Sequence, residues 1–439
     1  MNLPAVPRDA AILDAAPFDV ASVRAAFPIL GERVNASSLV YLDSAATSQK
    51  PLAVLEAEAS FLARGNAAVH RGAHTLAAEA TESFEDARAA VAAFIGAEPD
   101  NIVWTSGATA GINLIAYSIG NASLGRGGEA ARRVALKPGD EIVVTESEHH
   151  ANLIPWQELA ARTGALLRHI PVQEDGQLDL AVAGALIGSR TRIVAFPHVS
   201  NVLGIVNPVA EIVTLAREVG ALTVLDACQS APHLALDLPA LGVDLAVFSG
   251  HKIFAPYGVG VLYGRSEVLE ALPPFLTGGS MITTVTLDTA EYLPPPQRFE
   301  AGTQPVSQAI GLAAATRYLG ELGHDAIAAR EASLERRLRE GLLEVAGVRM
   351  LGDASGAERV ALASFDVDGV HAHDVGQFLD ARGVAVRVGH HCAQPLHRRF
   401  GITASVRASA AFYNTEEEID IFLDALSGVS AFFGVEGTR

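Results

Sequence analysis

The middle of the chain alternates short apolar segments with amphipathic ones, and this alternation constrains the fold more than any other feature. Five apolar runs are typical of buried β-strands: Glu141–Val144, Arg192–Phe196, Leu222–Leu225, Asp244–Phe248 and Gly258–Tyr263. Between some of them, Ile154–Arg162 and Val209–Val219 carry apolar residues at helical spacing. Strands separated by helices predict an α/β fold, with a mostly parallel sheet covered on both faces. Such sheets bind ligands beyond the C-terminal ends of their strands.

The pattern changes after a helical stretch near Ile310–Glu321. Strands are predicted at Arg359–Val367, Ala385–Val388 and Ser405–Ala408, with a helix at His373–Arg382 and a last helix that begins at Asn414 or Thr415. They predict a smaller α+β domain. We expect residues 1–34 to pack as an N-terminal segment with this small domain, 35–318 to form the large domain and 319–439 the small one. The glycine-rich stretch Asn121–Gly128 suggests a surface loop or insertion.

Composition excludes several classes of protein. The chain of 439 residues is 49% hydrophobic, which is enough to bury a large core. Lys and Arg number 32 against 50 Asp and Glu, and the formal charge of −18 argues against nucleic-acid or anionic-membrane partners. The uncharged run Asn101–Gly125 is interrupted by small and polar residues, so no membrane span is expected. Two cysteines and no signal-peptide pattern lead us to expect a cytoplasmic protein.

Chemically useful side chains follow two of the predicted strands. Lys252 ends the tetrapeptide Ser249–Lys252, directly after Asp244–Phe248. Burial would depress the pKa of its amine and make it nucleophilic, as a Schiff-base lysine requires; a surface lysine in a turn is the alternative. Asp226 and Gln229 follow Leu222–Leu225, where the carboxylate could hold a pyridinium nitrogen or cap a helix.

Two further turns suggest contacts to a planar, phosphorylated ligand. Ser106–Thr109 lies between a strand and a helix, where free N–H groups and the Thr109 hydroxyl could hold a phosphate. Its spacing is not that of a P-loop. His149 follows another strand and could stack on a planar cofactor, or be a histidine satisfied within its loop.

The segment Arg387–Pro395 combines a free cysteine with two histidines in a loop bounded by glycine and proline. Cys392 could be an exposed thiolate of low pKa. A metal site at His390, His391, Cys392 and His397 is the less favoured alternative, because zinc sites have four ligands at a recognisable spacing; we expect no metal. Arg387 and Arg407 could clamp a carboxylate or be solvated surface arginines. Together with the preceding groups, these residues meet the requirements of pyridoxal phosphate acting on an amino acid.

The sequence resembles the SufS-type cysteine desulfurases, which are class V aminotransferase-like enzymes of fold type I that use pyridoxal phosphate. The resemblance covers nearly the whole chain, from about Val23 to Leu426. The segments that carry it are Tyr41–Pro51, Ala68–His74, Glu148–Asn152, His198–Gly204, Ser249–Lys252, Arg298–Thr303, Arg387–Cys392 and Arg407–Ser409.

The resemblance implies a role for each candidate residue. Lys252 would bind the cofactor covalently, Asp226 would hold the pyridinium nitrogen, Gln229 would bond the ring hydroxyl, and His149 would stack on the ring and move protons. The residues implied to hold the phosphate are Thr109, Ser249, His251 and, from a partner subunit, Thr303. The residues implied to fix the substrate carboxylate are Asn201, Arg407 and, nearby, Arg387. Cys392 would be the nucleophile.

The implied reaction converts L-cysteine to L-alanine and leaves a persulfide on Cys392. In the family this sulfur passes to a SufE- or SufU-like acceptor for iron–sulfur cluster assembly, and the enzymes are homodimers. Ala108, Gln304-Pro305 and the insertion near Asn121–Ala135 depart from the family pattern. Selenocysteine lyase activity is the main alternative. A plain aminotransferase would leave Cys392 without a role, and a protein that kept only the fold would not take up the cofactor.

Overall fold

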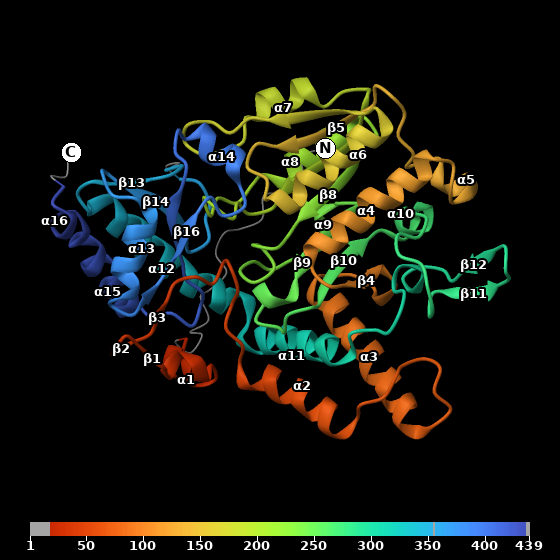
Figure 1. The fold of residues 1–439 in the computed structure, drawn as a ribbon, viewed down its shortest axis with the longest axis horizontal. Coiled ribbons are helices and arrows are strands. Elements are labelled where there is room, and N and C mark those ends of the chain that lie inside the picture. Colours follow the sequence, from red (N-terminus) through yellow and green to blue (C-terminus); the bar gives the residue numbers. More distant parts are fainter. Residues whose placement is uncertain (1–17, 354–355, 436–439) are drawn as a thin grey trace, which may run out of the picture.

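A seven-stranded sheet forms the centre of the computed structural model, which describes residues 18–353 and 356–435 (Figure 1). Its strand order is β4-β10-β9-β8-β7-β5-β6. The strands are β4 (Ile102–Thr105), β5 (Glu141–Thr145), β6 (Leu166–Ile170), β7 (Thr191–Pro197), β8 (Leu222–Asp226), β9 (Leu245–Ser249) and β10 (Gly260–Gly264). Strands β6, β5, β7, β8 and β9 run parallel, and β10 pairs antiparallel with β9 and β4. The predicted, mostly parallel sheet is confirmed.

Both faces of this sheet are buried, because successive residues of its strands point into different apolar clusters. In β5, Ile142 and Val144 pack in the cluster that contains α4 and α6, whereas Val143 packs in the cluster that contains α8. The helices of this part are α2 (Leu52–Arg64), α3 (Thr75–Phe94), α4 (Ala108–Ser123), α5 (Gly128–Ala131), α6 (Ile154–Thr163), α7 (Leu180–Leu186), α8 (Val209–Glu218), α9 (Leu238–Leu241), α10 (Ser266–Ala271) and α11 (Val306–Leu322). Full burial explains the continuous apolar runs of the sequence.

A second, four-stranded antiparallel sheet follows in the chain, with order β13-β14-β17-β16. Its strands are β13 (Val348–Met350), β14 (Leu362–Val367), β17 (Ser405–Ser409) and β16 (Arg387–Gly389). The accompanying helices are α12 (His324–Glu344), α13 (Ala372–Asp380), α14 (Gln394–Arg399), α15 (Glu416–Ser427) and α16 (Val429–Phe433). The predicted strand Ala385–Val388 is wrong as one element: β15 (Val384–Ala385) pairs with β3 (Val40–Tyr41), and only β16 joins the four-stranded sheet.

The beginning of the described chain lies beside its C-terminal part (Figure 1). Arg24, in α1 (Val20–Ala25), donates to both carboxylate oxygens of Glu418 at 2.8 and 3.0 Å. The ring of Phe27 contacts that of Phe412, with 6.1 Å between centroids. Residues 1–17 of the expected N-terminal segment lie outside the described residues, and the boundaries at 34/35 and 318/319 stay predictions.

The expected surface loop at Asn121–Gly128 is partly wrong. Its first three residues form the last turn of α4, since Ala122 packs in the apolar core. The helix stops just beyond, where Gly125 and Gly127 adopt positive φ angles of 80° and 86°. A hairpin of β11 (Ile282–Val285) and β12 (Ala290–Tyr292) projects at the edge of the molecule (Figure 1). None of the helices within the described ranges is long and apolar enough to cross a membrane.

A buried ion pair in the large-sheet part gives a test of the packing. Arg88 donates to both oxygens of Glu300 at 2.6 and 2.9 Å, and the two side chains are 2% and 3% exposed. Arg88→Met would leave the Glu300 carboxylate buried without its cation, so we expect a loss of about 3–5 kcal/mol of unfolding free energy, measured by urea denaturation. Arg337→Met is the matched control: its pair with Asp420 is about half exposed, so its loss should change the unfolding free energy far less. Equal losses in both variants would contradict this account.

Candidate active site

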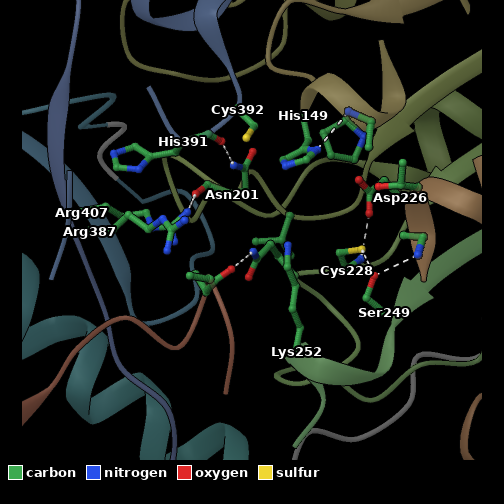
Figure 2. A pocket seen from close by; sticks show the side chains of 18 of the residues that line it. His149, Asn201, Asp226, Cys228, Ser249, Lys252, Arg387, His391, Cys392 and Arg407 are labelled. Carbon is green, nitrogen blue, oxygen red and sulfur yellow. Dashed lines mark hydrogen bonds between the residues drawn. The ribbon is translucent and has the colours of Figure 1, made fainter. Parts of the chain in front are cut away.

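A cavity of about 400 Å³ lies where the C-terminal ends of β7, β8 and β9 meet the turn after β16. Figure 2 shows the side chains that line it, with the two arginines on one side and Asp226 and Ser249 on the other. Every predicted site residue except Thr303 lines this cavity: Thr109, His149, Asn201, Asp226, Gln229, Ser249, His251, Lys252, Arg387, Cys392 and Arg407. Side chains from both sheets therefore converge on one space.

Lys252 lies in a short helical turn, Gly250–Lys252, directly after β9. Four donors from one earlier loop fix this turn by bonding the His251 carbonyl oxygen: Thr47 Oγ1 at 3.0 Å, Ser48 N at 3.1 Å, Ser48 Oγ at 3.2 Å and Lys50 Nζ at 3.1 Å. No acidic side chain pairs with the Lys252 amine among the residues described. Its position is thus set by the backbone, and its amine is left free to react.

The far side of the cavity offers groups that fit a pyridine ring. The Asp226 carboxylate ends β8 and accepts from the Cys228 backbone N–H at 2.9 Å. Gln229 donates its amide to the Ala45 carbonyl at 2.8 Å, which leaves its Oε1 atom buried without a partner. A buried acceptor without a donor is costly, and a phenolic hydroxyl on the bound ring would satisfy it.

A phosphate cradle lies at the N-terminus of α4. Ser249 Oγ accepts from the Ala108 N–H at 2.9 Å, and Thr109 adds a second hydroxyl. The helix can come this close to the sheet because Gly107 and Gly260 lack side chains: a Cβ on Gly260 would lie 2.5 Å from the Gly107 Cα. A helix of 16 residues presents free N–H groups and a favourable dipole there. Together these groups fit pyridoxal phosphate.

The imidazole of His149 is held neutral in the cavity. Burial, assisted by the nearby Lys252 charge, lowers its pKa to about 4. Its Nδ1 accepts from the Ala151 N–H at 3.0 Å, so in the neutral ring Nε2 carries the proton. Burial also lowers the pKa of His251 to about 4. His149 can therefore present a flat, uncharged face and one N–H donor.

The opposite side of the cavity is cationic. Arg407 is 3% exposed, and burial lowers the pKa of its guanidinium to about 10, which keeps it charged at neutral pH. Asp43 lies 3.4 Å from Arg407 and 3.3 Å from Arg387, while Arg407 Nη1 donates to the Asn201 carbonyl at 2.9 Å. The Arg407 Nε atom is buried without a partner. This arrangement suits a ligand carboxylate, and Asp43, within the segment Tyr41–Pro51, was not singled out from the sequence.

The two cysteines differ sharply. Cys228 is buried, and burial raises the pKa of its thiol to about 12. Cys392 is exposed at the mouth of the site, and both it and His391 have positive φ angles, of 56° and 47°. No group of three metal-ligating side chains occurs among the described residues. Instead, the Nε2 atoms of His391 and His397 each form a hydrogen bond with Ser405 Oγ, at 3.0 and 2.9 Å.

Thr303 is the predicted site residue that lies elsewhere. It lines a separate cavity of about 250 Å³, together with Phe61, Asn66 and Ser307. Its expected role was in the site of a partner subunit, and a single chain does not test that role, so it stays a prediction.

Comparisons with known proteins point to one family. The family model described as aminotransferase class-V matches residues 40–422. The chain is 55% identical to the probable cysteine desulfurase 2 of Mycobacterium leprae over 423 residues, which cover 96% of this chain and 99% of that one. Its fold is similar to that of the cysteine desulfurase CsdA of Escherichia coli, with a TM-score of 0.84 and 37% identity over 94% of this chain and 99% of that one. It is also similar to a C-DES mutant with glycine covalently linked to the PLP cofactor, with a TM-score of 0.77 and 26% identity over 92% and 98% of the two chains.

Burial of neutral histidines predicts how stability depends on pH. Burial lowers the pKa of His198 to about 4, below the value of about 6.5 for an unfolded chain. Between these values the unfolded state binds more protons, so the free energy of unfolding should fall as the pH falls from 6.5 to 4, by roughly 3 kcal/mol for this residue. His198→Gln should reduce the slope of unfolding free energy against pH, measured by urea denaturation. The reduction should correspond to about one fewer proton taken up on unfolding. An unchanged slope, or the same change in the exposed control His373→Gln, would refute this.

Proposed function

The chain belongs to the aminotransferase class-V family and is a pyridoxal-phosphate-dependent cysteine desulfurase of fold type I, and from this premise we propose how its residues divide the work. Its substrate is L-cysteine. The observation that carries the assignment of residues is the single cavity that joins Lys252, Asp226 and Arg407 to the exposed Cys392. A plain aminotransferase would not need this thiol.

Each face of the cavity would hold one part of the cofactor. Lys252 would bind it covalently, Asp226 would contact the pyridine nitrogen, and Gln229 Oε1 would accept from the ring hydroxyl. The phosphate would lie among Thr109, Ser249 and His251, with His149 against the ring. When bound, pyridoxal phosphate withdraws electrons from the α-carbon of an amino-acid substrate.

The remaining residues would position and attack the substrate. Arg407, Asn201 and Arg387 would hold the cysteine carboxylate, and the neutral His149 would present its Nε2–H as a donor. The Cys392 thiolate would form a bond to the substrate sulfur while the substrate Cβ–S bond breaks. The electron pair of that bond stays with Cβ, which takes up a proton to give L-alanine, and Cys392 keeps the sulfur as a persulfide.

Sulfur transfer and assembly are the wider part of the proposal. The connection between β16 and α14 is short, which favours the SufS-type group and a SufE- or SufU-like acceptor that delivers sulfur for iron–sulfur clusters. A homodimer would bring the partner's Thr303 to the phosphate. A cytoplasmic location would suit the chemistry, because a reducing compartment keeps the Cys392 thiol free of disulfides between turnovers.

Removal of the thiol tests the assigned chemistry. With a thiol reductant present to release the persulfide sulfur, we expect wild-type enzyme to produce alanine and sulfide from L-cysteine, with more sulfur released when an acceptor protein is added. Cys392→Ala should lose L-cysteine turnover by about a hundredfold or more, since it lacks the attacking sulfur. Mass spectrometry should find the persulfide on Cys392 and still find it there in Cys228→Ala, because the Cys228 thiol is buried and protonated. Full cysteine turnover by Cys392→Ala would refute the persulfide route, and turnover of selenocysteine alone would favour selenocysteine lyase.

The trans role of Thr303 is tested by mixing two impaired variants at a limiting concentration of pyridoxal phosphate. Thr303→Ala should weaken pyridoxal phosphate binding about tenfold, the effect of losing one hydrogen bond to a charged group. If Thr303 acts in the partner's site, a mixed dimer of Lys252→Ala and Thr303→Ala protomers contains one intact site and regains alanine production. If it acts within its own chain, the mixture contains no intact site and produces no more alanine than Thr303→Ala alone, which would refute the trans role.

A further inference from the structure

The Asn201 side chain connects the two halves of the cavity. Asn201 lies in the turn after β7, and its Nδ2 donates to the His391 carbonyl oxygen at 2.7 Å (Figure 2). The backbone carbonyl oxygen of Asn201 accepts a hydrogen bond from Arg407 Nη1 at 2.9 Å. One residue thus contacts both the cationic group expected to hold the substrate carboxylate and the peptide that precedes Cys392.

The turn that this bond supports is in an unfavourable conformation. His391 and Cys392 are consecutive residues with φ angles of 47° and 56°, the left-handed region that residues with a β-carbon rarely occupy. Such a turn persists only where surrounding contacts hold it. Two bonds to consecutive backbone carbonyls do so: Asn201 Nδ2 to His391 O, and His150 N to Cys392 O at 2.7 Å. Loss of either bond favours a relaxed backbone.

A carboxylate in the cavity would compete for the Asn201 amide. Arg407 has an unpartnered Nε, and its contact with Asp43 is long, at 3.4 Å, so it retains capacity for an anion. An ionised carboxylate beside Arg407 accepts stronger hydrogen bonds than a peptide carbonyl does. The amide that now holds the His391 carbonyl is therefore drawn toward the ligand.

We propose that Asn201 couples the substrate carboxylate to the Cys392 turn: the bound carboxylate takes the Asn201 amide from the His391 carbonyl and releases the turn. The inference rests on the proposed function, because its ligand is an amino-acid carboxylate. Cys392 is then held back in the free enzyme and becomes mobile once a substrate is in place. A mobile thiol can reach first the substrate sulfur and later the acceptor.

Hydrogen exchange of the holoenzyme measures this release directly. While Asn201 holds the Cys392 turn, the Ala393 amide donates to the His390 carbonyl at 2.8 Å and the Gln394 amide donates to His150 Nε2 at 3.2 Å. We compare L-alanine, the product, with L-alaninamide, which keeps the amine and the methyl group but lacks the carboxylate. L-alanine should speed exchange of these two amides about fivefold, the effect of losing one hydrogen bond, and L-alaninamide should not.

Three variants complete the test. Asn201→Ala should show the fast exchange without ligand and no further response to L-alanine. Asn207→Ala is the matched control, because the Asn207 amide donates to the Pro197 carbonyl at 2.8 Å in a neighbouring turn without contacting the cysteine turn. It should exchange and respond as the wild type does. Asn201→Asp, which keeps the shape but cannot donate, should behave like Asn201→Ala and serves if that variant does not fold.

The outcomes separate this inference from the proposed function. The visible spectrum of the holoenzyme reports alanine binding independently of exchange. A normal spectral response with unchanged exchange, or an equal exchange response in Asn201→Ala, overturns the coupling and leaves the function intact. Absence of both the spectral response and alanine production from L-cysteine overturns the two together.

Discussion

A buried guanidinium group joins the parts of the chain that build the site. Arg407 lies in the middle of β17, is 3% exposed, donates to the Asn201 carbonyl beyond the seven-stranded sheet, and lies 3.4 Å from Asp43 near the start of the fold. Burying such a cation without partners costs several kcal/mol, so the three segments close around it. The cavity lies beside this junction. Its shape is therefore fixed by the same contacts that hold the two sheets together.

The electrostatic character of the cavity is set by the positions of the few charged groups that line it. The chain as a whole carries a formal charge of −18, yet Lys252, Arg387 and Arg407 line this one space. Burial keeps His149 and His251 neutral by lowering the pKa of each to about 4. Apart from Lys252, positive charge is thus confined to two fixed positions: the arginines on one side of the cavity (Figure 2) and the N-terminus of α4 at the phosphate cradle. A ligand with a carboxylate and a phosphate at opposite ends has only one favourable orientation.

The sequence predicted the elements whose local pattern matches their burial and missed those whose pattern does not. Strand β8 is buried along most of its length and its apolar run is continuous, whereas β6, at the sheet edge, is largely exposed and has no such run. Most of the candidate site residues could be predicted from the sequence because they directly follow a strand. The contact between Asn201 and His391 spans 190 residues and leaves no local pattern. The proposed role of Thr303 involves a second chain, and a single chain does not test it.

The two cysteines show why residue type alone does not define a nucleophile. Cys228 faces the same cavity, but burial raises its thiol pKa to about 12 and ties it to the core, so at neutral pH it has almost no thiolate. Cys392 lies in an exposed turn whose left-handed backbone must be held by its neighbours. In the proposed function, Cys392 meets a substrate inside the enzyme and an acceptor outside it. The proposed coupling through Asn201 would serve both encounters, because it holds the strained Cys392 turn in the free enzyme and releases it when substrate binds.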